Sequence, residues 1–222
     1  MSYALFWSGG KDSLLALDRA QRRGLHVTHL VNIHESNSGR VRFHGVRTHL
    51  LEAQAEALGL ELISKATHPG SFEDAFLSAL EALKGRDIKG ICFGNIHLSD
   101  IRAWYECRTS ANGFVHVEPL WNSAPRELID EFLARGHRAR IVSVLLQHGH
   151  PSWLGREFTD GFVAELAADP SIDLCGERGE YHSFAFGGPL FRSDVLVRSL
   201  GTFEREGHLI LDLALARPCA ET

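Results

Sequence analysis

The hexapeptide at residues 8–13, which reads S-G-G-K-D-S, constrains the fold of this 222-residue chain more than any other segment. It follows an apolar run at residues 4–7 that predicts a buried strand, and it opens a helical spacing of apolar residues over 14–22. Glycines let the backbone approach an anion, and a helix N-terminus presents free N–H groups and a positive dipole to it. The order strand, glycine turn, helix therefore predicts a site for a nucleotide or pyrophosphate.

The hexapeptide matches neither the Walker pattern nor the dinucleotide pattern of phosphate loops. Lys11 would add a mobile positive charge, free to reach the anion, and the hydroxyls of Ser8 and Ser13 would add donors. An ordinary glycine turn capped by serine is the alternative interpretation, and the surrounding strand and helix favour the phosphate loop. The residues expected to bind the nucleotide here are Ser8, Gly9, Gly10, Lys11, Asp12 and Ser13.

The composition is that of an ordinary soluble protein, with 44% hydrophobic and 23% charged residues. A net charge of −5 argues against a broad basic surface that would bind nucleic acid. No apolar stretch approaches the length of a membrane span, and no signal peptide precedes the first strand, so we expect a cytoplasmic protein without a membrane partner. The four cysteines form no C-x-x-C pair and are expected to be free thiols.

The first half alternates strand and helix patterns, which predicts an α/β fold with a doubly wound parallel sheet. The expected strands are 4–7, 25–33, 60–64, 88–93 and 114–117, and the expected helices are 14–22, 46–58, 72–83 and 98–111. Ser71, with Asp74 three residues on, is expected to cap the third helix. Ligands bind beyond the carboxyl ends of such strands, where the phosphate loop, His34 and the Gly94-Asn95 turn lie.

The pattern changes after residue 121. Helices are expected at 125–134 and 159–168, and strands at 139–146, 181–186, 190–197 and 209–215. We therefore expect a nucleotide-binding domain over residues 1–122 and a smaller α+β domain, for the substrate, over 123–222.

Four motifs together resemble the diphthine–ammonia ligase (diphthamide synthase) family of PP-loop, N-type ATP pyrophosphatases. They are the hexapeptide, P-L-W at 119–121, S-W-L-G-R at 152–156, and G-E-R-G-E-Y-H-S-F at 176–184 followed by G-P-L-F at 188–191. The resemblance implies the adenine nucleotide α-hydrolase-like sheet, with ATP and Mg²⁺ as cofactors. It also implies that a carboxylate attacks the α-phosphate of ATP, releasing pyrophosphate, and that ammonia then displaces AMP to leave an amide. The partners are then ATP, ammonium and a carboxylate acceptor, which is a modified protein residue or a small molecule.

The resemblance also assigns roles to single residues. Lys11 and Asp12 would act in catalysis, with Asp12 holding the metal, and Gly94 and Asn95 would contact the nucleotide. His34 is expected to contact the nucleotide because of its position at a strand end, with an ordinary surface residue as the alternative. Glu177 and Glu180 would be catalytic, because a tight glycine turn between them can point both carboxylates into the cleft, where they bind ammonium or serve as a base; surface carboxylates are the alternative. The residues expected to bind the substrate are Arg102, Glu106, Glu177, Gly179, Glu180 and His182. A salt bridge within one helix is the alternative for Arg102 and Glu106, which stand four residues apart.

Two other functions remain open at this stage. A tRNA-modifying PP-loop enzyme would need a basic face and often paired cysteines, which this sequence lacks. A nucleotide-binding protein without catalysis is the second. The assembly state is also open, with a homodimer among the alternatives.

Overall fold

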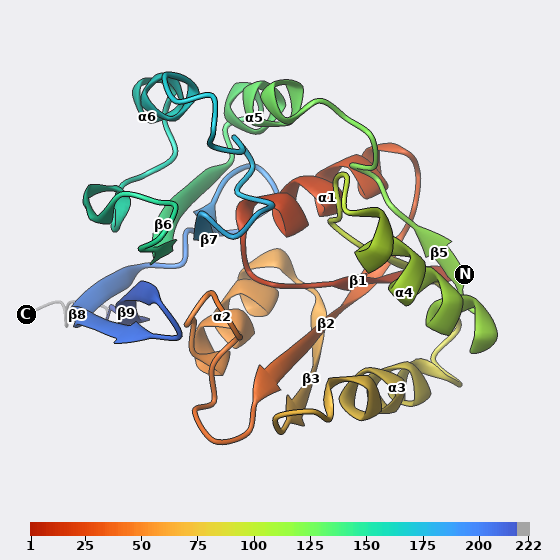
Figure 1. Cartoon of the computed structure of the whole chain (residues 1–222). Helices are drawn as coiled ribbons and strands as arrows, with labels where there is room; N and C mark the ends of the chain where they lie inside the picture. Colours follow the sequence, from red (N-terminus) through yellow and green to blue (C-terminus); the bar gives the residue numbers. More distant parts are fainter. Residues whose placement is uncertain (217–222) are drawn as a thin grey trace, which may run out of the picture.

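A five-stranded parallel sheet forms the first half of the chain. The computed structural model describes residues 1–216, and Figure 1 shows the arrangement of its elements. The strands are β1 (Ser2–Phe6), β2 (Val27–Glu35), β3 (Glu61–Thr67), β4 (Ile88–Cys92) and β5 (Val115–Val117). Their order is β3-β2-β1-β4-β5, and every neighbouring pair is parallel. The chain thus winds outward from β1 in both directions, which confirms the doubly wound fold.

Two helices cover each face of this sheet. On one face, α1 (Lys11–Arg22) and α2 (Thr48–Leu58) bury Leu14 and Leu50 in a cluster that includes Leu5 of β1. On the other, α3 (Phe72–Leu83) and α4 (Ser99–Ala111) place Phe76 and Tyr105 against Phe93. Successive side chains of a strand point to opposite faces, so the two clusters share strands without sharing side chains.

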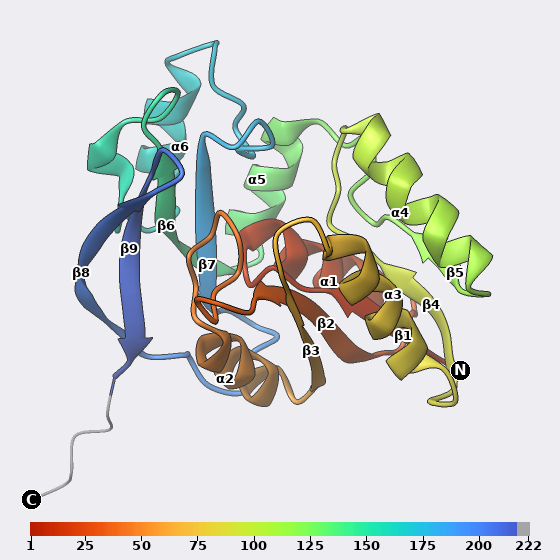
Figure 2. The same ribbon diagram turned by 60° about the horizontal axis from the view of Figure 1, so that its bottom comes forward.

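A four-stranded antiparallel sheet forms the second half. Its strands are β6 (Arg138–Leu145), β7 (Tyr181–Gly187), β8 (Val197–Arg205) and β9 (His208–Leu215), in the order β7-β6-β9-β8. Three short helices accompany it, namely α5 (Pro125–Ala134), η1 (Pro151–Trp153) and α6 (Asp160–Ala167). Figure 2 shows β7 running close to α1, so this sheet stands beside the face of the first sheet that α1 and α2 cover.

Two sequence-based expectations are wrong. The strand expected at 190–197 is a loop up to residue 196, because its backbone bonds go elsewhere: Arg192 N–H donates to Ala57 O and Val195 N–H to Phe186 O. The fourth strand of the sheet is instead β8, which the sequence analysis left unassigned. Ser71 precedes α3 but does not cap it with its side chain, because its hydroxyl bonds to the backbone of His68.

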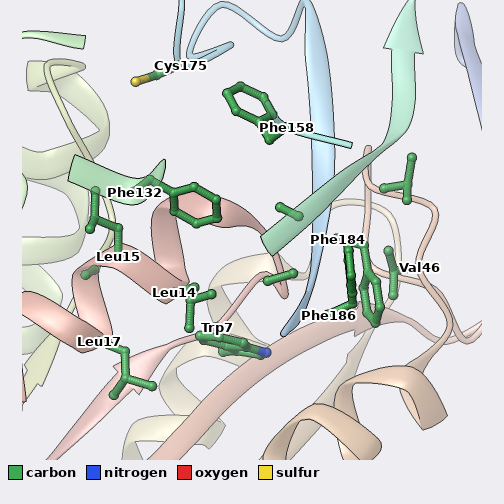
Figure 3. Close-up of a cluster of buried hydrophobic side chains, with 14 of the residues drawn as sticks. Trp7, Leu14, Leu15, Leu17, Val46, Phe132, Phe158, Cys175, Phe184 and Phe186 are labelled. Carbon is green, nitrogen blue, oxygen red and sulfur yellow. The ribbon is translucent and has the colours of Figure 1, made fainter. Parts of the chain in front are cut away.

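One hydrophobic core continues from the first half into the second. Figure 3 shows Trp7 and Leu14 on one side of this seam and Phe132, Phe158 and Phe184 on the other. All five side chains are almost fully buried. The boundary expected near residue 122 stays a prediction, and the two halves pack against each other across a shared apolar interior.

Within residues 1–216, no helix combines the length and the apolar character that crossing a membrane requires. Cys92, Cys107 and Cys175 are free thiols, in agreement with the expectation. The remaining cysteine, Cys219, lies outside the described residues.

Candidate active site

A cleft of about 1040 Å³ opens beyond the carboxyl ends of β1, β2 and β4. This is the place where the strand order reverses, because β2 and β4 lie on opposite sides of β1. The cleft walls come from both halves of the chain. Among the residues expected to bind nucleotide or substrate, the cleft is lined by Ser8, Lys11, Asp12, Ser13, His34, Gly94, Asn95, Glu177, Gly179 and His182.

The turn between β1 and α1 requires its glycines. Gly9 has φ = +83°, and a Cβ there would lie 2.6 Å from the Leu51 side chain. Gly94 packs against the same turn, because a Cβ there would come within 3.3 Å of the backbone of Asp12 and Ser13. Larger residues at either position would push the turn away from the strand ends.

Some N–H groups of this turn are satisfied and others are open. Gly10 N–H donates to Ser8 Oγ at 3.3 Å, and Lys11 N–H donates to Ser183 Oγ of β7 at 3.0 Å. The N–H groups of Gly9 and Ser13 have no acceptor among the described residues. Because they lie at the positive end of α1, they can donate to an anion.

Lys11 is buried beneath the turn rather than extended into the cleft. Its side chain is 4% exposed, and Nζ donates to Asp12 Oδ2 at 2.9 Å and to Cys175 O. Burial lowers the pKa of the ammonium, but the surrounding groups, first among them the Asp12 carboxylate, together outweigh it, so the net pKa is raised and the side chain stays charged. The sequence analysis expected a free cation at this loop, and the structure shows one fixed by contacts from both halves.

His34 and Asn95 lie on the wall formed by the parallel sheet. The His34 Nδ1 lies 2.9 Å from Ser64 Oγ of β3, and burial lowers the pKa of the imidazole. The Asn95 amide donates to Glu118 Oε1 at 2.8 Å, which fixes its orientation next to Gly94. Both residues border the cleft as expected.

Arg102 and Glu106 do not reach the cleft. The Arg102 Nε lies 3.4 Å from the buried Glu118 carboxylate and 3.5 Å from Glu106, while its guanidinium covers the Trp121 ring. Glu106 is exposed on α4. Both residues were expected to bind substrate, and their contacts instead hold the β5–α5 connection against α4.

Glu177 borders the cleft on the loop that precedes β7. Burial, with the nearby charge of Asp12, raises the pKa of its carboxyl to about 7, despite the opposing charge of Lys11. A carboxyl with such a pKa exchanges a proton readily near neutrality. The position of Glu177 agrees with the role that the sequence predicted.

Glu180 departs from the expectation that both carboxylates point into the cleft. Its side chain is buried, and its two oxygens accept the N–H groups of Asp173 at 2.8 Å and Arg178 at 3.2 Å. The carboxylate thereby closes the 173–180 loop on itself. The Glu180 carboxylate therefore points into this loop, and its expected role in catalysis and substrate binding stays a prediction.

Two family models match this chain. The diphthamide synthase N-terminal domain matches residues 1–113, and the diphthamide synthase C-terminal domain matches residues 124–214. The chain belongs to the diphthamide synthase family. It is 26% identical to a diphthine–ammonia ligase of Rattus norvegicus, over 89% of this chain and 83% of that protein, and 25% identical to that of Homo sapiens, over 90% and 84%. The crystal structure of a predicted subunit of tRNA methyltransferase from Methanocaldococcus jannaschii is similar with a TM-score of 0.47 and 16% identity, over 85% of this chain and 98% of that one.

Membership of the diphthamide synthase family confirms the expected resemblance and the expected enzyme class, a ligase. The site of this family member also contains side chains that the sequence analysis missed. They are Phe43, His44, Tyr181, Ser183 and His208, all of which line the cleft. Only the position of Tyr181 and Ser183 within the 176–184 motif could have indicated them, since the chain has 13 histidines and no spacing singles out His44.

Proposed function

We propose that this member of the diphthamide synthase family is an ATP-dependent ligase that adenylates a carboxylate and transfers ammonia to it, with a diphthine-like acceptor. One observation carries the proposal: Ser13, whose N–H group is open, and Glu177 border the same cleft, although they come from opposite halves of the chain. An anion site and a base facing one cavity are the two parts that such a reaction needs.

In the first step an oxygen of the acceptor carboxylate attacks the α-phosphorus of ATP. A phosphorus–oxygen bond forms, the bond to the β-phosphate oxygen breaks, and pyrophosphate leaves with the electron pair. Both reactants are anions, so fixed positive charge and N–H donors lower the barrier. The α1 terminus supplies the donors, and the ammonium of Lys11 supplies a charge directly beneath them.

The donor set fits a Mg²⁺ that is held mainly by phosphate oxygens. Within residues 1–216, no group of three or more histidine, cysteine or acidic side chains is arranged to hold a metal. Mg²⁺ commonly takes one or two carboxylates together with substrate phosphates, and the partly exposed Asp12 carboxylate borders the cleft. Asp12 would hold the ion, which would neutralise charge on the phosphate chain when bound.

In the second step ammonia attacks the acyl carbon, and AMP leaves with the electron pair of the broken carbon–oxygen bond. Ammonium has no lone pair to donate, so a proton must first be removed. Glu177 can bind the cation as a carboxylate and accept that proton, because burial already favours its protonated form. His182 and Gly179 border the same part of the cleft and would contact the acceptor.

The test combines purified protein, ATP, Mg²⁺ and ¹⁵N-ammonium with elongation factor 2 that carries diphthine, and with small carboxylates in parallel. The expected result is AMP and pyrophosphate in equal amounts and ¹⁵N in an amide of the acceptor. Glu177→Gln should lose amide formation, whereas Glu127→Gln, at an exposed position of α5, should retain it.

Release of ADP, or of AMP without dependence on a carboxylate, would contradict the proposal. Co-purification of tRNA that consumes ATP on addition of a sulfur or nitrogen donor would favour the tRNA-modifying alternative. Tight ATP binding with no AMP from any acceptor would favour a protein that binds nucleotide without catalysis.

A further inference from the structure

The short loop at residues 41–46 is built to present one histidine at the phosphate turn. His44 stands between Phe43, with φ = +63°, and Gly45, with φ = +68°. A bulky residue at positive φ is strained and persists only where its surroundings impose it. Here Gly45 N–H donates to Val41 O at 2.9 Å and Val41 N–H to Val46 O at 2.8 Å, which closes the loop.

His44 contacts the phosphate turn directly. A Cβ on Gly10 would lie 3.1 Å from His44 Cε1, so the ring packs against the N-cap residue directly before α1. Its Nδ1 lies 3.1 Å from the backbone oxygen of Ser183. Because a carbonyl oxygen only accepts, Nδ1 carries the hydrogen and the neutral ring exposes a lone pair at Nε2.

That lone pair has no protein donor. Among residues 1–216, Nε2 of His44 makes no hydrogen bond, and the side chain lines the cleft. Figure 2 shows the 36–47 loop beside β7, the strand that also supplies Ser183 to α1. An acceptor atom therefore faces a site whose other groups are arranged for an anion.

The surroundings of His44 keep it neutral in the free protein. Burial lowers the pKa of the ring to about 4, and the charges of Lys11 and His208 add to this effect. The ring of His182 lies 4.6 Å away, and its own pKa is lowered well below the usual value by burial and by the two other histidines. No acidic side chain is among the groups that shift the pKa of His44, so only an incoming anion would favour the imidazolium form of the ring.

We propose that His44 binds the phosphate chain of ATP as an imidazolium, so that nucleotide binding draws a proton onto Nε2 which is then available to the leaving pyrophosphate. This inference rests on the proposed function, since it needs ATP at the α1 terminus. When the bond between the α-phosphorus and the bridging oxygen breaks, the electron pair stays on that oxygen. Nε2–H transfers its proton to the pyrophosphate, and the ring returns to its neutral form.

The experiment measures proton uptake by titration calorimetry of ATP, without acceptor or ammonium, in buffers of different ionisation enthalpy. Between the free and bound pKa values, the wild type should take up about one proton more per bound ATP than His44→Gln does. Any change in the protonation of ATP itself is the same with both proteins. The difference in proton uptake between wild type and His44→Gln therefore measures protonation of the His44 ring. His49→Gln, at an exposed position of α2, should match the wild type.

A measurement on the unaltered protein complements the variant. With ¹³C-labelled histidine, the Cε1 signal of His44 should titrate near pH 4 in the free protein and above about 6 when pyrophosphate saturates the site. A midpoint that stays near 4, or equal proton uptake by wild type and His44→Gln, would overturn this inference and leave the ligase proposal standing. Failure of the wild type to bind ATP at all would overturn both.

Discussion

The Nζ atom of Lys11 lies 4.8 Å from the centroid of the Tyr181 ring. Lys11 begins α1 in the first half of the chain, and Tyr181 begins β7 in the second. The Tyr181 hydroxyl in turn donates to Leu174 O at 2.5 Å, in the loop whose Cys175 carbonyl accepts from Lys11. The cation of the phosphate loop is therefore also a structural link between the two halves.

Lys11→Ala should abolish turnover and also lower stability. It leaves the Asp12 carboxylate without its cation and the Cys175 carbonyl without its donor, in a buried setting. Leaving a buried acceptor without its donor typically costs about 1–3 kcal/mol. Urea unfolding should show the loss, whereas Lys89→Ala, at an exposed position, should change the free energy of unfolding little. An unchanged unfolding midpoint for Lys11→Ala would show that Lys11 is not a structural link.

Glu177→Gln should remove an acid limb from the pH profile of kcat/KM. The wild-type rate should fall as the pH drops through about 7, because protonation of Glu177 removes the base. The variant should be slower by roughly 10²–10⁴-fold and flat across this range. A profile with the same limb in the variant would assign the titration to another group.

The same substitution should raise stability at alkaline pH. The folded-state pKa of Glu177 lies above its ordinary value, so its contribution to stability is fully present below about 4.5 and is lost as the pH rises through about 7. Glutamine stays neutral throughout. Thermal melts at pH 8 and pH 4 should therefore show a stabilising difference only at pH 8.

Glu180→Ala should lower the stability of the fold rather than change the pH dependence of the reaction. It leaves the N–H groups of Asp173 and Arg178 without their buried acceptor, at about 1–3 kcal/mol for each. We expect a lower unfolding midpoint in urea, with the wild-type position of the pH limb kept in the protein that remains folded. A stable Glu180→Ala protein without activity would instead support the catalytic role that the sequence analysis expected.

Asp212→Asn should loosen the loop that carries His44. Asp212 of β9 accepts from Arg40 at 2.9 Å and from Arg47 at 2.6 Å, and both arginines flank that loop. The hydrogen bond from Arg47 lowers the pKa of Asp212, despite partial burial, so its stabilising effect is present above about 3.8 and is lost as the pH falls further. The variant should lose about 1–3 kcal/mol at pH 7, less at pH 3, and should bind pyrophosphate more weakly. Glu204→Gln on the neighbouring strand serves as the control.

The fold was predictable where local patterns carried the information. The α3 and α5 helices begin and end at the expected residues, since the amphipathic spacing of their apolar residues marks their extent. The strand expected at 190–197 failed because its apolar residues serve a loop that packs on α2 and β7, which is a tertiary arrangement. β8 was missed because most of its residues are exposed, and an exposed edge strand lacks the alternation of a half-buried one.

The site was predictable in its first half and less so in its second. A phosphate turn is a local device, so six adjacent residues suffice to find it. The positions of the Glu177 and Glu180 side chains depend instead on how one loop folds. Glu177 borders the cleft, whereas the Glu180 carboxylate accepts backbone N–H groups within the loop, although the two residues stand three apart. His44 depends on a contact with β7, more than a hundred residues along the chain.

Gln54 of α2 joins two distant segments, because its side chain accepts from Trp7 Nε1 at 2.8 Å and donates to Gly9 O at 3.0 Å and to Ala185 O at 2.5 Å. The Ala185 N–H donates to the same Gly9 oxygen at 2.8 Å. During synthesis on the ribosome, the turn at residues 8–13 emerges among the first residues, but its contacts with β7 can form only after that strand has emerged. If this turn binds ATP as proposed, affinity for the nucleotide depends on completed assembly, and we expect a truncated chain that ends before β7 to lose binding.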